Sequence, residues 1–489
     1  MSSTSTSPLP DPRICEKARH SRDARFDGLF FTAVSSTGIY CRPVCPAPAA
    51  KRANVRYFAN AAAAEAAGFR PCLRCRPELA PGNGWWNPAD HTVARALKLI
   101  ADGALEGGSV EQLAARVGVG ARQLRRLFVE RVGAPPRSVH ATRRLLFAKQ
   151  LLTETAMPVT QVALAAGFQS LRRFNAAFVL ANRMQPRQLR RQPRASADAP
   201  LVLRLEYRPP YDFDAMLDFL RTRALPGVES VDGHGYARAF GPPQAPGWFH
   251  LGVWPGAQAL RLQVHCPQPT ALLAVVTRVR RMFDLDANPL PITQTLASDA
   301  LLGPLCARRP GLRVPGCWDG FEIAVRAVLG QQISVARART LANRFVQRFG
   351  APLAAGMPYA LTHLFPTVQM LAEADFSDIG LTRARATTVQ TVAQALLDGR
   401  VGLGGGQTLE EFVQRWTALR GIGPWTAQYI ALRQGDPDAF PAGDLILRRQ
   451  AADGGAALTT VQLAARAAPW QPWRAYAVMH LWCAAGDRS

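Results

Sequence analysis

Four cysteines near the amino terminus have a spacing with chemical meaning. They lie at Cys41, Cys45, Cys72 and Cys75, which gives a CysX3Cys pair and a CysX2Cys pair separated by 26 residues. Two such pairs are typical of tetrahedral zinc sites with four thiolate ligands, so the pattern predicts one bound Zn²⁺. A closed four-thiolate site is most often structural, and the spacing alone leaves a structural and a reactive role open.

A second group of candidate residues lies near the carboxyl end. The stretch LRGIGPWTAQYIALRQ (419–434) places Gly421 and Gly423 between two helical patterns. A glycine hairpin of this kind lets backbone N–H groups approach a DNA phosphate, although the motif alone is a weak signal. Asp444, in FPAGDLILRR, is the candidate reactive carboxylate. Its alternative role is to cap the helix that follows.

Charge and composition favour a polyanionic partner. The formal net charge is +23, and the first 200 residues hold 30 Lys+Arg against 13 Asp+Glu. Such an excess favours nucleic-acid binding, with arginine-rich codon usage as the alternative. The 489 residues exceed one hydrophobic core, so several domains are expected. We expect no membrane span and no signal peptide, and nine mostly scattered cysteines favour a reducing, cytoplasmic compartment.

The elements that position these residues differ along the chain. Residues 88–190 have helical periodicity, and a central helix is expected near 135–152. In SVEQLAARVGVGARQLRRLFVERVG, Ser109 and Gln112 form a capping box and the glycines at 118–120 form a turn. A second unit of this kind turns at Gly167. The helices after the two turns carry polar residues suited to DNA: Arg122, Gln123, Arg125, Arg126, Ser170, Arg172, Arg173 and Asn175. A plain helical bundle is the alternative.

The remaining chain predicts an α+β segment followed by helices. Residues 201–312 alternate like strands, with helices expected near 212–223 and 270–283, and the pattern after Cys317 is again helical. The turn-rich stretch Ala80–Pro88 and the polar stretch Arg191–Pro200 suggest boundaries between domains.

The cysteine region resembles a known zinc domain. TGIYCRPVC, with RYFANAAAAEAAGFRPCLRCRPE, closely resembles the amino-terminal domain of Ada-type adaptive-response proteins over residues 13–79. The resemblance implies that Cys41 is both a zinc ligand and the nucleophile that accepts a methyl group from a DNA methylphosphotriester. Five arginines lie near the ligands in the sequence, and we expect their side chains either to approach phosphates or to be ordinary solvated surface residues: Arg42, Arg52, Arg70, Arg74 and Arg76.

Two further resemblances cover the rest. Residues 88–192 resemble an AraC-type regulator module, which implies that the second helix of each unit enters the major groove. Residues 203–486 resemble AlkA-type 3-methyladenine glycosylases of the helix-hairpin-helix class. That resemblance implies Asp444 as the catalytic carboxylate and Trp425, Tyr429, Trp482 and Phe219 as aromatic residues around a flipped base.

The resemblance also implies how the reaction ends and how the base is flipped. Trp425 stands where bifunctional relatives carry a Schiff-base lysine, which implies a monofunctional enzyme without strand cleavage. Gln332 stands at the wedge that fills the gap left by the flipped base, where a polar residue departs from the apolar one of the family. Only Cys483 lies in the last hundred residues, so no iron–sulfur cluster is expected.

The sequence therefore predicts a multidomain protein with five segments. They are a small α/β zinc domain (1–85), an all-α double helix-turn-helix module (88–192), a linker (193–202), an α+β lobe (203–312) and an all-α helix-hairpin-helix glycosylase domain (313–489). The expected function is a methyl-accepting transcriptional regulator fused to a glycosylase for alkylated purines. The alternative is a methylation-activated transcription factor whose glycosylase-like half only binds DNA.

The expected partners and place follow from this function. They are alkylated and promoter double-stranded DNA and RNA polymerase, for a monomeric, nucleoid-associated cytoplasmic protein. No PCHR motif is present, so repair of O6-methylguanine is not expected.

Overall fold

The computed structural model describes residues 9–82, 91–190, 200–452 and 454–486, which divide into two compact units. The first unit comprises Met1–Pro209, Val253–Thr277 and Leu285–Asn288, and the second comprises Pro210–Gly252, Arg278–Asp284 and Pro289–Ser489, each in its described parts. Most of the predicted linker at 193–202 and of the turn-rich stretch Ala80–Pro88 lies outside the described residues. None of the helices described is both long and apolar enough to span a membrane.

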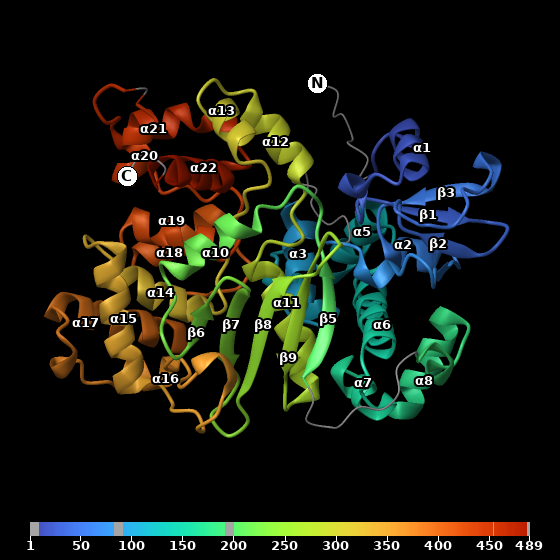
Figure 1. Cartoon of the computed structure of the whole chain (residues 1–489), viewed down its shortest axis with the longest axis horizontal. Coiled ribbons are helices and arrows are strands. Elements are labelled where there is room, and N and C mark those ends of the chain that lie inside the picture. Colours follow the sequence, from blue (N-terminus) through green and yellow to red (C-terminus); the bar gives the residue numbers. More distant parts are fainter. Residues whose placement is uncertain (1–8, 83–90, 191–199, 453, 487–489) are drawn as a thin grey trace. The chain divides into compact units, whose positions relative to one another are not determined.

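The cysteine region is a small α/β fold, as predicted. Its sheet has the strand order β3-β1-β2-β4 (Figure 1). β1 pairs antiparallel with β2 and β3, whereas β2 and β4 are parallel. Buried aromatic residues, among them Phe31 and Tyr40, form its core. The elements are α1 (Pro12–Ser21), β1 (Phe31–Val34), β2 (Ile39–Cys41), β3 (Val55–Phe58), α2 (Ala61–Ala66) and β4 (Arg70–Pro71), with short 3₁₀ turns at Ala24–Phe26, Arg52–Asn54 and Pro77–Leu79.

The next segment is entirely helical and confirms the double helix-turn-helix prediction. Ser109 caps α4 through a complete capping box with Gln112. Gly118 and Gly167 take left-handed backbone angles at the two turns, with φ values of 79° and 78°. The helices are α3 (His91–Ala101), α4 (Val110–Arg116), α5 (Ala121–Val132), α6 (Pro136–Glu154), α7 (Val159–Ala165), α8 (Leu171–Asn182) and α9 (Pro186–Leu189).

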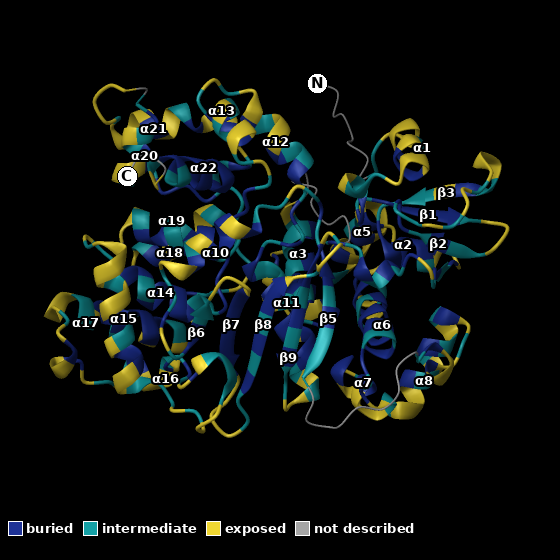
Figure 2. Cartoon of the chain, viewed as in Figure 1, coloured by how far each residue is buried: buried dark blue, intermediate teal, exposed yellow. Residues whose placement is uncertain are grey.

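Helix α6 is the buried spine of the first unit. Twelve of its 19 residues are buried, including Lys149 and Gln150 (Figure 2). It packs against α2 of the cysteine region and against strand β5 (Leu201–Glu206). β5 pairs antiparallel with β9 (Ala259–His265). Both strands belong to the first unit, although β5 begins at the end of the predicted linker and β9 lies beyond it.

The second unit begins with the rest of the α+β segment. Strands β6 (Glu229–Val231), β7 (Gly235–Phe240) and β8 (Gly247–Val253) form consecutive antiparallel pairs. The helix expected near 212–223 is α10 (Phe213–Arg221). The helix expected near 270–283 is α11 (Leu272–Met282), which follows a 3₁₀ turn at Pro269–Ala271; this turn and α11 up to Thr277 belong to the first unit.

Helices make up the rest of the second unit. They pack around buried aromatic side chains such as Trp416 and Trp470. They are α12 (Pro289–Ala297), α13 (Leu302–Arg308), α14 (Gly320–Leu329), α15 (Val335–Phe349), α16 (Val368–Ala372), α17 (Arg383–Leu397), α18 (Leu409–Thr417), α19 (Pro424–Arg433), α20 (Leu445–Gln450), α21 (Thr460–Arg466) and α22 (Arg474–Gly486), with 3₁₀ turns at Pro358–Ala360, Ser377–Ile379 and Ala468–Trp470.

Candidate metal centre and aromatic pocket

The fold brings the four cysteines together. The parallel pairing of β2 and β4 aligns Tyr40 with Pro71, so Cys41 and Cys72 follow side by side. The four Sγ atoms all lie within 4.8 Å of one another. In a tetrahedral Zn–S₄ site the sulfurs are separated by about 3.8 Å, since each Zn–S bond is about 2.3 Å. The cysteines therefore fit one Zn²⁺ as a ligand set.

The four cysteines differ in how accessible they are. Cys72 and Cys75 are buried, whereas Cys41 and Cys45 are partly exposed. Cys41 lines a groove of about 640 Å³. Five arginines also line this groove, namely Arg19, Arg22, Arg42, Arg70 and Arg74, of which Arg19 and Arg42 are paired with carboxylates. A phosphate group can therefore approach Cys41 along a basic groove.

Two of the arginines near the ligands have internal partners. Arg42 is only 4% exposed, and its guanidinium pairs with Asp27 and Glu206. Arg76 pairs with Glu78 and Glu154. The expectation that Arg42 contacts a phosphate is wrong, because its charge is already neutralised inside the protein.

The second unit gathers the predicted aromatic residues into one cluster. Trp425 and Tyr429 are one turn apart on α19 and stack with ring centroids 5.2 Å apart. Trp482 on α22 lies 6.3 Å from Tyr429, and Phe219 on α10 lies 6.5 Å from Trp482 in a nearly parallel orientation. The four side chains thus lie within one cluster of aromatic faces.

Asp444 lies beside the aromatic residues. The indole N–H of Trp425 donates to Oδ2 at 3.1 Å, and that of Trp482 donates to Oδ1 at 3.4 Å. Oδ1 also accepts the backbone N–H of Leu447 at 3.0 Å, so Asp444 is the N-cap of α20. Both indole donors and the positive end of the helix dipole stabilise the carboxylate anion.

Two arginines that were not predicted from the sequence lie beside the aromatic side chains. Arg433 donates to the hydroxyl of Tyr429 at 3.0 Å, and Arg223 lies 3.8 Å above the ring of Phe219. Burial alone would raise the pKa of the Tyr429 phenol, but the charges of Arg433 and Arg223 outweigh burial and lower it. Arg433 follows Tyr429 by four residues on one helix, and this spacing was an available signal.

A hydrogen bond connects the glycine hairpin to Gln331, the residue before the predicted wedge. Gly421 has φ +89°, and a Cβ added there would lie 2.1 Å from Thr388 Oγ1, so only glycine fits. The side-chain amide of Gln331 donates to the carbonyl of Gly421 at 2.9 Å. Gln332 is exposed and has φ +56°. Gly423 is the N-cap of α19 and is exposed.

Six of the eight predicted DNA-reading residues are exposed on α5 and α8: Arg122, Gln123, Arg125, Arg126, Arg172 and Arg173. Ser170, the N-cap of α8, and Asn175 are partly buried. Arg125 pairs with Glu111 at 2.6 Å, also at the surface. The structure thus leaves the six exposed side chains accessible to a groove of DNA.

Family models match four successive parts of the chain. They are the metal binding domain of Ada (14–78), a helix-turn-helix domain (113–192), the AlkA N-terminal domain (202–319) and the HhH-GPD superfamily base excision DNA repair protein (325–472). The class is therefore a fusion of an Ada-like regulatory half with a helix-hairpin-helix glycosylase fold.

Comparison with whole proteins narrows the class to one family. The chain is 41% identical over 96% of its length to a Mycobacterium tuberculosis protein named "Probable bifunctional transcriptional activator/DNA repair enzyme AlkA", of which it covers 95%. It belongs to this family. It is also 34% identical, over 58% of its length, to the DNA-3-methyladenine glycosylase 2 of Escherichia coli, of which it covers 97%.

One solved structure shows the fold of the carboxyl-terminal part. It is a 3-methyladenine DNA-glycosylase from Archaeoglobus fulgidus, 22% identical, with a TM-score of 0.51, and the match covers 58% of this chain and 99% of that one.

Proposed function

We propose that the chain excises alkylated purines such as 3-methyladenine from double-stranded DNA by hydrolysing the N-glycosidic bond. One observation carries this proposal: Asp444 accepts hydrogen bonds from Trp425 and Trp482 of the aromatic cluster. The carboxylate is thus held beside aromatic faces on which a flipped base can stack. The proposal is supported by membership of a family whose named relatives include DNA repair enzymes.

The carboxylate of Asp444 stabilises positive charge on the sugar. As the bond between C1′ and the base nitrogen breaks, its electron pair leaves with the base and the sugar becomes an oxocarbenium-like cation. A fixed anion beside that cation lowers the barrier, and water then adds at C1′. The indole N–H groups hold the carboxylate in place, so little reorganisation is needed.

The aromatic faces select the damaged base. A purine alkylated at N3 or N7 is cationic in the nucleotide, and an electron-rich aromatic face attracts it by roughly 1–2 kcal/mol. The positive charge also weakens the glycosidic bond, so a permissive pocket still discriminates. Trp425 has no nucleophilic amine, and the product is therefore an abasic site in an intact strand.

The amino-terminal half accepts a methyl group and regulates transcription. Bound Zn²⁺ holds its ligand sulfurs as thiolates at neutral pH. The Cys41 sulfur attacks the methyl carbon of a DNA methylphosphotriester, and the bond from that carbon to oxygen breaks with its electron pair left on the phosphate. The products are a phosphodiester and S-methylcysteine, so each protein reacts once. Partial exposure at the basic groove supports Cys41 and Cys45 over the buried Cys72 and Cys75, and the choice of Cys41 between the two rests on the resemblance to the Ada-type domain.

The regulatory part of the proposal includes how the protein binds promoter DNA and where in the cell it acts. Helices α5 and α8 enter the major groove of a promoter. The protein acts as a monomer in the cytoplasm, associated with the nucleoid, and contacts RNA polymerase at the promoter. The predicted domain boundaries remain part of this proposal.

A base-release assay tests the glycosylase. The full-length protein, given duplex DNA treated with a methylating agent, should release 3-methyladenine. The Asp444→Asn variant should retain DNA binding and lose about 10²–10³ in rate, the cost typical of one preorganised electrostatic group. Asp438→Asn is the matched control, because Asp438 pairs with Arg474 and not with the pocket indoles. Equal, measurable rates for Asp444→Asn and wild type would contradict the role of Asp444, and no base release by the wild type would favour the alternative of a half that only binds DNA.

A trapping experiment tests the reaction type. Sodium borohydride reduces a Schiff base between enzyme and abasic sugar to a stable adduct. None should form, and the strand should stay intact. A covalent adduct would show a lyase and would contradict the monofunctional mechanism.

A further inference from the structure

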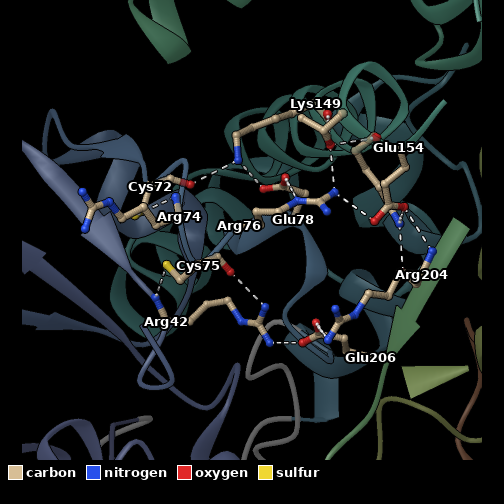
Figure 3. Close-up of polar contacts among 12 residues, drawn as sticks. Arg42, Cys72, Arg74, Cys75, Arg76, Glu78, Lys149, Glu154, Arg204 and Glu206 are labelled. Atoms are coloured by element: carbon tan, nitrogen blue, oxygen red, sulfur yellow. Dashed lines mark hydrogen bonds and ion pairs between the residues drawn. The ribbon is translucent and has the colours of Figure 1, made fainter. Parts of the chain in front are cut away.

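Residues from outside the zinc domain contact the zinc ligands either directly or through Arg42. Arg42 follows Cys41, and its backbone N–H donates to the sulfur of Cys75 at 3.3 Å. Its guanidinium donates to the carbonyl oxygen of Cys75 at 3.0 Å. Its guanidinium also pairs with Asp27. It pairs in addition with Glu206 of strand β5 (Figure 3). The segment that holds Cys75 is therefore anchored to a strand more than 120 residues further along the chain.

Cys72 has a corresponding contact from the central helix of the helix-turn-helix module. The ammonium group of Lys149, on α6, donates to the carbonyl oxygen of Cys72 at 3.2 Å and pairs with Glu78. Lys149 is only 1% exposed. An ammonium group is costly to bury unless it is paired and hydrogen-bonded, so this geometry is tightly constrained.

The two contacts are joined by a chain of polar interactions. Glu206 pairs with Arg204 at 2.8 Å, and the backbone N–H of Arg204 donates to Glu154 of α6 at 3.1 Å. Glu154 pairs with Arg76 at 2.9 Å, and Arg76 pairs with Glu78 at 3.1 Å. Figure 3 shows these side chains converging from the cysteine region, α6 and β5.

We propose that Lys149 and Glu206 are positioning residues of the zinc centre, Lys149 through the carbonyl of Cys72 and Glu206 through Arg42. Both lie outside the segment that matches the metal-binding family model, residues 14–78. The zinc centre is then a joint construction of the cysteine region, the helix-turn-helix module and the first strand of the AlkA-like part. This inference rests on the zinc site and not on methyl transfer or base release.

Outer-shell contacts of this kind orient the ligands of a metal. Substitution of such a partner typically costs about 10–100-fold in metal affinity. The coupling is reciprocal, so zinc binding should also stabilise the parts of α6 and β5 that supply the contacts.

Two substitutions in the full-length protein test the proposal. In Lys149→Met, Glu78 keeps its pairing with Arg76; in Glu206→Gln, Arg42 keeps its pairing with Asp27. Neither variant therefore leaves a buried charge without an ionic partner, and both are expected to fold. Zinc transfer to a chromogenic chelator should be at least about 10-fold faster than in wild type. The ligand-field absorption of the cobalt(II)-substituted protein, which reports geometry at the metal, should also change.

Controls separate positioning of the ligands from general loss of stability. Gln150→Met alters the buried residue next to Lys149 on α6. The side-chain amide of Gln150 donates to Glu154 and to the carbonyl oxygen of Arg204, and not to a cysteine. Glu111→Gln removes an exposed carboxylate. Both controls should keep the wild-type zinc-release rate and cobalt spectrum.

Hydrogen exchange measures the reciprocal effect. Zinc should slow amide exchange in β5 and in the carboxyl-terminal half of α6 of the wild-type protein, and less so in Lys149→Met. The proposal is overturned if both variants release zinc at the wild-type rate with the wild-type cobalt spectrum. It is also overturned if either matched control shows the same acceleration.

Discussion

At the scale of single residues, Asp444 combines two roles that the sequence posed as alternatives. It caps α20 through Leu447 and also faces the indole N–H groups of Trp425 and Trp482. The two roles support each other, because a capped carboxylate has one orientation and the helix amino terminus stabilises its charge. A substitution there changes local stability as well as the proposed chemistry, so DNA binding and thermal stability have to be measured beside the rate.

Gln332 provides a test of the wedge at the same scale. Its φ of +56° is unfavourable for a residue with a side chain, and the cost is about 1–2 kcal/mol. Strain of this kind is retained where a side chain is held for function. Gln332→Gly should leave the melting temperature equal to or above that of wild type and should lower the rate of base release.

The matched variant for this test is Gln332→Leu, which keeps a side chain at the turn. It should release base at least as fast as wild type, because an apolar side chain stacks better in the gap. Wild-type activity in the glycine variant would exclude Gln332 as the wedge.

At the scale of elements, the sequence predicted α6 as a central helix. It did not predict that α6 contacts the zinc ligands. The helical period predicted its extent to within two residues at each end, because local spacing determines amphipathic helices. Lys149 and Glu206 were missed, since their partners are separated from them by 71 and 164 residues along the chain. For the same reason the sequence left Arg42 between a phosphate contact and ordinary surface: its nearness to Cys41 in sequence says nothing about Asp27 and Glu206.

Helix α6 also carries a buried histidine that should make the stability of the protein fall in acid. His140 is buried, and neither ring nitrogen has a hydrogen-bond partner among the described residues. Burial, with the charges of Arg144, Arg143 and Arg137, lowers its pKa to about 4. The unfolded chain binds a proton near pH 6.5, so stability is lost as the pH falls from about 6.5 towards 4, by up to about 3 kcal/mol.

Replacing the imidazole should remove that part of the acid sensitivity. The melting temperature of His140→Leu should fall less between pH 7 and about 4 than that of wild type. His20→Gln, at a largely exposed side chain, is the control and should follow the wild-type curve. Parallel curves for His140→Leu and wild type would show that His140 is not the source.

At the scale of the whole molecule, methylation of Cys41 should act as a switch for DNA binding. Four thiolates on Zn²⁺ carry a net charge of about −2, which repels phosphates, and methylation leaves about −1. The affinity of the full-length protein for its promoter should therefore rise after reaction with methylphosphotriester DNA. The comparison requires one fixed salt concentration, because phosphate contacts depend strongly on salt. Unchanged affinity would leave Cys41 as a scavenger without a regulatory role.

The central claim is that one chain both records and removes alkylation damage, and one reaction mixture tests it. Full-length protein is incubated with an excess of duplex DNA treated with a methylating agent. Free bases are measured by chromatography and the protein by peptide mass spectrometry. The account predicts many equivalents of released 3-methyladenine and one methyl group per protein, located on Cys41 and absent from Cys45, Cys72 and Cys75. Absence of base release, or a methyl group on another cysteine, would contradict it.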